Sequence, residues 1–68
     1  MTVAKAIHDA RKSKGLSQDE LAKVTGVHRV TIARIETGGG YDVETIAALC
    51  SFLGLSMDTL LKPRRKSA

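Results

Sequence analysis

Hydrophobic positions recur at helical spacing along most of this chain. Near the N-terminus Val3, Ala6, Ile7 and Ala10 form one stripe. Spacings of three and four residues are typical of an amphipathic helix. We therefore predict a first helix over residues 2–14, ended by Gly15.

Two shorter helices are predicted next. Ser17 followed by Glu20 forms the sequence pattern of a capping box, which starts a helix. Gly26 can take the left-handed conformation that ends one. After a tight turn, the following helix spans residues 28–37 and is closed by Gly38.

Two more helices complete the predicted set of five. One begins after Asp42, a good N-cap residue, and runs to Leu53. The other begins after Ser56 and ends near Leu61, because Pro63 prevents continuation. Burying five amphipathic stripes together predicts a compact all-α fold. The predicted core positions are aliphatic or small: Val3, Ile7, Ala10, Leu16, Leu21, Ala22, Val27, Ile32, Ile35, Ile46, Leu49, Cys50, Leu53, Leu55 and Leu60.

Composition fits one small domain over residues 1–61, followed by a short basic tail, residues 62–68, that we expect to be disordered. The net charge is +4, with an excess of positive charge before residue 17 and in the tail, and an excess of negative charge over residues 38–61. These charges either orient the domain toward phosphate or form a solvated surface. No membrane span or signal peptide is visible, so we expect a cytoplasmic protein.

The central segment LSQDELAKVTGVHRVTIARIETG resembles the helix-turn-helix of the phage repressor and Cro family, the lambda-repressor-like DNA-binding domains. The resemblance extends outward to Arg11 and, on the other side, through IAALCSFLGLSMDTLL, so it covers nearly the whole chain. It implies a regulator that binds double-stranded DNA and places the helix over residues 28–37 in the major groove.

The resemblance places base contacts on this helix. Arg29, Val30 and Arg34 match base-contacting positions of the family. A guanidinium can bond O6 and N7 of guanine together, while Val30 and Ala33 offer apolar surface to a thymine methyl. Alternatively, either arginine contacts only phosphate.

Phosphate contacts are expected at the ends of the two helices. Backbone N–H groups of Ser17 and Gln18 and the local helix dipole suit an anion, and Gln18 and Thr37 match family positions that contact the DNA backbone. Lys12 is a further candidate, with a merely solvated role as the alternative.

The chain departs from the family pattern in two places. His28 stands where the family usually has serine or threonine, and it is a candidate base or phosphate contact whose role the sequence leaves open. Gly39 and Gly40 replace common basic residues in a shorter loop, so that the loop contacts phosphate through its backbone amides or Tyr41, or not at all.

An ion pair between Arg11 and Glu36 is also implied by the resemblance, because both residues stand in the family's register. Each lies at the edge of its helix's apolar stripe, so we expect a structural bridge between the first and third helices. The alternative is two unrelated surface charges, worth about 0–1 kcal/mol if paired while exposed.

Surplus apolar positions suggest a dimer interface. Ala48, Phe52, Met57 and Leu61 extend the hydrophobic surface beyond the core stripe of the last two helices. Family members commonly pair through this end of the domain. Alternatively, Phe52 packs into its own small core.

Two functions therefore remain open. The first is a transcriptional regulator, expected to be a repressor, that binds an inverted repeat as a homodimer. The second is a DNA-binding antitoxin or restriction-modification controller protein whose last two helices bind a partner protein, a toxin or the polymerase. We expect no enzyme activity, cofactor, metal or small-molecule ligand, because His8, His28 and Cys50 lack metal-ligand spacing and no sensing domain is visible after Leu61.

Overall fold

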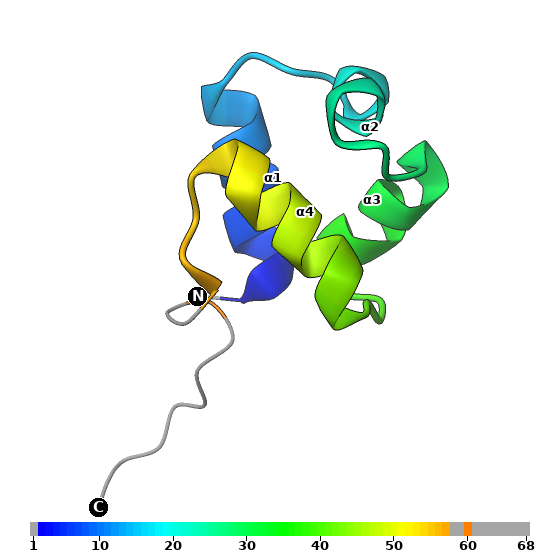
Figure 1. The fold of residues 1–68 in the computed structure, drawn as a ribbon, viewed down its shortest axis with the longest axis vertical. Coiled ribbons are helices and arrows are strands. Elements are labelled where there is room, and N and C mark those ends of the chain that lie inside the picture. The colour runs from blue at the N-terminus through cyan, green and yellow to red at the C-terminus, as the bar shows by residue number, and fades with distance from the viewer. Residues whose placement is uncertain (1, 58–59, 61–68) are drawn as a thin grey trace, which may run out of the picture.

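The computed structural model describes residues 2–57 and residue 60. Over this part the chain is all-helical, as predicted, with helices α1 (Val3–Ser13), α2 (Gln18–Thr25), α3 (Arg29–Glu36) and α4 (Val43–Leu53). Figure 1 shows α4 lying alongside α1, with α2 and α3 beside this pair. Helices α1 and α2 each pack against both α3 and α4.

The helix ends follow the predicted start and stop residues. The Ser17 hydroxyl accepts a hydrogen bond from the Glu20 backbone N–H at 3.0 Å, and the Ser17 N–H donates to Glu20 Oε1 at 2.8 Å, which completes the capping box of α2. Gly26 ends α2 in the left-handed conformation, with φ of 77°. Asp42 caps α4 by accepting from the Thr45 N–H at 3.0 Å.

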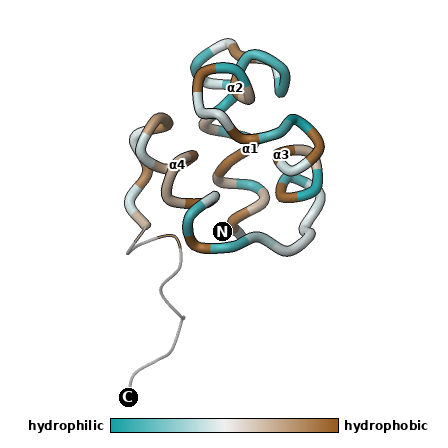
Figure 2. Tube along the Cα trace, turned by 45° about the vertical axis from the view of Figure 1, so that its right-hand side comes forward, coloured by the Kyte–Doolittle hydropathy of each residue, from teal (hydrophilic) through white to brown (hydrophobic). Residues whose placement is uncertain are grey.

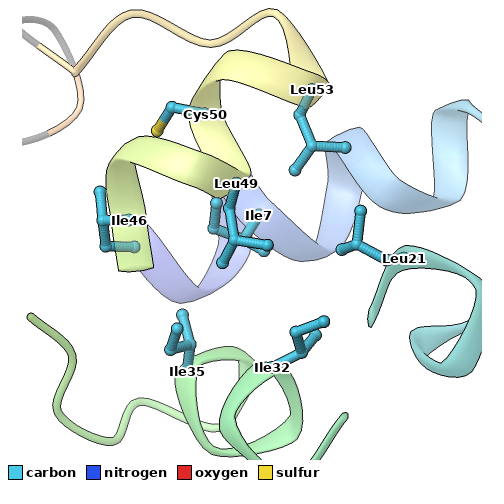
Figure 3. Close-up of a cluster of buried hydrophobic side chains, with 8 residues drawn as sticks. All are labelled: Ile7, Leu21, Ile32, Ile35, Ile46, Leu49, Cys50 and Leu53. Carbon is cyan, nitrogen blue, oxygen red and sulfur yellow. The ribbon is translucent and has the colours of Figure 1, made fainter. Parts of the chain in front are cut away.

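The core is aliphatic and draws on every helix. Within each helix hydrophobic and hydrophilic stretches alternate along the chain (Figure 2). This amphipathic pattern allows each helix to bury one face and expose the other. Figure 3 shows Ile32 and Ile35 of α3 pointing toward Ile7 of α1 and Leu49 of α4. The other predicted core positions are buried or pack against this cluster, and the cluster comprises Ile7, Leu21, Ile32, Ile35, Ile46, Leu49, Cys50 and Leu53.

The predicted count of five helices is not confirmed. The fifth helix falls mostly on residues 58, 59 and 61, which lie outside the described residues, as does the predicted tail. Of the expected segment, Met57 and Leu60 are helical, and the Leu60 N–H donates to the Ser56 carbonyl at 2.9 Å. None of the helices in the described ranges is long and apolar enough to cross a membrane.

Candidate nucleic-acid interface

Helix α3 presents a mixed basic and apolar face to solvent. Ile32 and Ile35 are buried on its inner face, which turns Arg29, Val30 and Arg34 outward. Val30 is 62% exposed, so it offers apolar surface on this face of the helix. The third apolar candidate, Ala33, is half-buried and so offers less surface than Val30.

The inner side of α3 is fixed to α1 by a bidentate ion pair. Arg11 Nε donates to Glu36 Oε2 at 2.7 Å, and Arg11 Nη2 donates to Glu36 Oε1 at 3.0 Å. The third nitrogen, Nη1, donates to the Leu16 carbonyl at 2.7 Å. The two side chains are only 10% and 4% exposed, so the pair is a buried bridge rather than two surface charges.

Gln18 is a third member of this network. Its Nε2 donates to Glu36 Oε1 at 3.1 Å, which ties the start of α2 to the end of α3. Burial alone would raise the pKa of Glu36, but hydrogen bonds from Arg11 and Gln18 lower this pKa below its ordinary value. Glu36 is therefore held as a carboxylate that accepts from both residues.

Arg29 lies against the preceding helix. Its Nε is 3.3 Å from Asp19 Oδ1, and the two side chains are 54% and 73% exposed. An exposed pair of this kind is worth little to stability. It does hold the guanidinium over α2 while leaving it open to solvent.

A concave surface lies where the C-terminus of α1 meets the N-terminus of α2. Four of the predicted DNA-contacting residues, Lys12, Ser17, Gln18 and Arg29, line it. The prediction that the Ser17 N–H is available to an anion is wrong, because Glu20 Oε1 occupies that donor. The Ser17 hydroxyl can still donate its proton to a phosphate, because in the capping box its oxygen only accepts a hydrogen bond from the Glu20 backbone N–H.

The end of α3 folds tightly onto Arg34. The Gly39 N–H donates to the Arg34 carbonyl at 2.7 Å, and the Gly38 N–H donates to the Ile35 carbonyl at 3.1 Å. Gly38 has φ of 93°. These two bonds with a left-handed residue form a Schellman motif. The Thr37 hydroxyl also donates to the Arg34 carbonyl, at 2.9 Å.

A sequence model of the helix-turn-helix family matches residues 7–60, which is most of the chain and includes every residue of the surface just described. The chain belongs to the Cro/C1-type helix-turn-helix family. It is thus a DNA-binding regulator of the lambda-repressor-like class. Comparisons with curated proteins and with solved structures gave no match.

In this helix-turn-helix protein, α2 and α3 are the two helices of the motif. His28 is the N-cap residue of α3 but makes no side-chain capping bond, so its imidazole is exposed at the start of the helix. Tyr41 is 43% exposed in the loop before α4. Thr37 already uses its hydroxyl proton within the protein, so it can only accept a hydrogen bond at a phosphate site unless that bond breaks.

Three of the four predicted dimer residues lie in the described part of the chain. Phe52 is 40% exposed, and the Lys14 Nζ lies over its ring at 5.6 Å from the centroid. Ala48 is half-buried. Met57 is partly buried and packs against the core. Leu61 lies outside the described residues.

Two contacts of this interface were missed by the sequence analysis. The Gln18–Glu36 hydrogen bond joins residues 18 apart, and no local pattern signals such a distance. The Arg29–Asp19 pair had a usable signal, because Asp19 stands in the first turn of α2 and Arg29 begins α3 across a short turn. In the described part of the chain no group of His, Cys, Asp and Glu side chains is arranged to hold a metal ion.

Proposed function

We propose that this protein is a transcriptional repressor that binds an inverted-repeat operator as a homodimer, with α3 in the major groove. The observation that carries the proposal is the outer face of α3, where two arginines flank an exposed valine on a helix fixed from behind by the Arg11–Glu36 pair. A fixed helix can align side chains with base edges, which sequence recognition requires.

Each exposed residue of α3 has a chemical partner in DNA. Arg34 and Arg29 each carry a planar guanidinium that fits O6 and N7 of guanine. Val30 would meet a thymine methyl, and Ala33 adds a smaller apolar contact beside it. His28 would reach a phosphate or a base edge at the start of the helix.

Phosphate contacts would hold α3 in place. Lys12, the Ser17 hydroxyl and Gln18 line the concave surface beside the start of α2, and Thr37 and Tyr41 follow the C-terminal end of α3. Such contacts fix orientation on the duplex without selecting sequence. The repressor role follows from occupancy, because a domain seated on its operator excludes polymerase from overlapping DNA.

Pairing of two copies through α4 would set the spacing of the half-sites. Phe52 and Ala48 are the described residues of this surface, and a two-fold axis here would place two α3 helices about 34 Å apart, one turn of DNA. The same exposed Phe52 supports a second candidate, a DNA-binding antitoxin or controller protein whose α4 meets a different protein. Sedimentation of the protein alone and with its operator separates these: dimers support the first, and monomers under both conditions support the second.

Binding of variants to a selected duplex and to a scrambled duplex tests the base contacts. Arg34→Ala should lose about 1–3 kcal/mol on the selected duplex and much less on the scrambled one. Lys12→Ala, as a matched loss of one positive charge, should weaken both alike and reduce the salt dependence. Equal losses for Arg34→Ala on both duplexes would assign Arg34 to phosphate.

A further inference from the structure

We infer that Gly39 is a specificity-determining residue, because the absence of a side chain there sets the position of Arg34. This inference rests on the proposed function of α3. Gly39 has no side chain to contact a base; it acts on DNA recognition through the arginine that packs against it.

The space above Gly39 is filled by Arg34. A Cβ atom at residue 39 would overlap the Arg34 Cγ, and it would lie 2.9 Å from the Arg34 carbonyl oxygen and 3.0 Å from its Cδ. The other glycines that end helices, Gly15, Gly26 and Gly54, have nothing within 4 Å of the same position. Gly39 is thus the glycine at which a side chain collides with the protein.

Backbone conformation does not account for a glycine at this position. The left-handed residue of the motif is Gly38, and Gly39 is not among the glycines with positive φ. A residue with a side chain can adopt the conformation of Gly39, so the close approach of Arg34, through both its side-chain stem and its carbonyl oxygen, is what calls for glycine.

At two other helix ends, the residue that follows the left-handed glycine carries a side chain. After Gly15 and Gly54 the next residues are Leu16 and Leu55, whose N–H groups donate to carbonyls five residues back at 3.2 Å and 2.9 Å. Both leucines pack against the core, which is the usual hydrophobic contact of such a helix end. At the end of α3 the equivalent residue is Gly39, and the aliphatic stem of Arg34 takes the vacant space.

The contact restricts a side chain that is otherwise free. Among the described residues no carboxylate pairs with Arg34, in contrast to Arg29, which pairs with Asp19. Bidentate contact with guanine needs the guanidinium in the plane of the base. A stem held against the loop limits the directions in which that plane can point, whereas a methyl group at residue 39 would move the stem or the last turn of α3.

The test compares Gly39→Ala with Gly40→Ala, whose added methyl meets nothing within 4 Å. A preferred site is first selected from random duplexes with the wild-type protein. Dissociation constants are then measured on that site and on duplexes with each base pair replaced in turn. Gly39→Ala should lose about tenfold in discrimination at the base pair that Arg34→Ala also relaxes, and Gly40→Ala should stay within about twofold of the wild type, since its methyl meets no atom of the protein.

Combining the substitutions tests whether the effect passes through Arg34. In an Arg34→Ala background only the contact with the residue 34 carbonyl remains, so Gly39→Ala should cause no further loss of discrimination at that base pair, and any loss of affinity that the carbonyl contact causes should be equal on all duplexes. Unchanged discrimination in Gly39→Ala, or an equal loss on every duplex, would overturn the inference. If the wild type selects no sequence, the proposed function fails and the inference fails with it; if it selects a site that Gly39→Ala recognises equally well, only the inference fails.

A measurement on the wild-type protein covers the case in which Gly39→Ala does not fold. The NMR order parameter of the Arg34 Nε–H in the free protein should lie above about 0.6, the range of a restrained group. A value below this would show that Gly39 does not hold the stem, and would overturn the inference without any variant.

Discussion

Arg11 and Glu36 form a bidentate ion pair that joins the C-terminal half of α1 to the last turn of α3. The two residues are 25 apart in the chain, with Nε–Oε2 and Nη2–Oε1 distances of 2.7 and 3.0 Å. The remaining nitrogen of Arg11 bonds the Leu16 carbonyl, in the loop that leads to α2. One guanidinium therefore connects three segments of the domain, and the orientation of α3 depends on it.

Glu36→Gln should lower the free energy of unfolding by about 3 kcal/mol, because it leaves the buried Arg11 charge without its counter-charge. Glu44→Gln is the matched control, since Glu44 is exposed in the first turn of α4, and it should cost less than about 1 kcal/mol. Urea denaturation of both variants measures the difference. Equal costs for the two would mean that the bridge contributes no more than a surface charge.

The dependence of stability on pH in the acid range should reflect the Glu36 carboxylate. The folded protein holds the pKa of Glu36 below its ordinary value of 4.5, so the unfolded chain binds more protons in acid. The stabilisation is present above about pH 4.5 and is lost as the pH falls through the lowered pKa of the folded state. Melting temperatures should therefore fall more steeply below this pH for the wild type than for Glu36→Gln. Parallel profiles would contradict the assignment.

Enlarging Ala22 should disturb the crossing of α2 and α3. Ala22 packs against the core from α2, where a small side chain allows close approach. Ala22→Leu should cost about 1–3 kcal/mol of stability through overpacking, whereas Lys23→Leu on the exposed neighbouring position should cost little. Thermal denaturation compares the two variants. Equal stability of both would show that the crossing of α2 and α3 accommodates a leucine at position 22 without overpacking.

Asp19→Asn should strengthen DNA binding modestly. It removes a carboxylate that lines the concave surface and frees Arg29 from an exposed pair worth about 0–1 kcal/mol. We expect affinity to rise by about twofold or more at low salt, with the gain shrinking as salt screens the charge. Asp9→Asn makes the same change in net charge on α1, at a residue outside the concave surface, and should raise affinity less. A gain no larger than that of Asp9→Asn would leave Asp19 without a role in binding.

Local patterns in the sequence were sufficient to predict most of the fold. The capping box at Ser17, the N-cap Asp42 and the left-handed Gly26 and Gly54 each act within a few residues, so their outcome is decided by neighbouring atoms. The buried face of α3 was equally predictable from spacing, because Ile32 and Ile35 repeat at the helical period.

The contacts that the sequence did not predict join residues on different helices or loops, whose relative positions are set only by packing. Gln18 was expected to face phosphate, and only the packed structure places its amide on Glu36. Gly39 was regarded as a missing basic residue, whereas the structure shows that its place is taken by the stem of Arg34. Met57 was predicted only as part of an outer surface, and spacing alone does not show that it also packs against the core.

Selection of bound duplexes from a random pool examines DNA binding, site symmetry and half-site spacing in one experiment. We expect an inverted repeat whose half-sites contain guanine and thymine, with centres about one helical turn apart, and a relaxed position when the selection is repeated with Arg34→Ala. Recovery of no preferred sequence, or of the same sequence with Arg34→Ala, would contradict the proposed function.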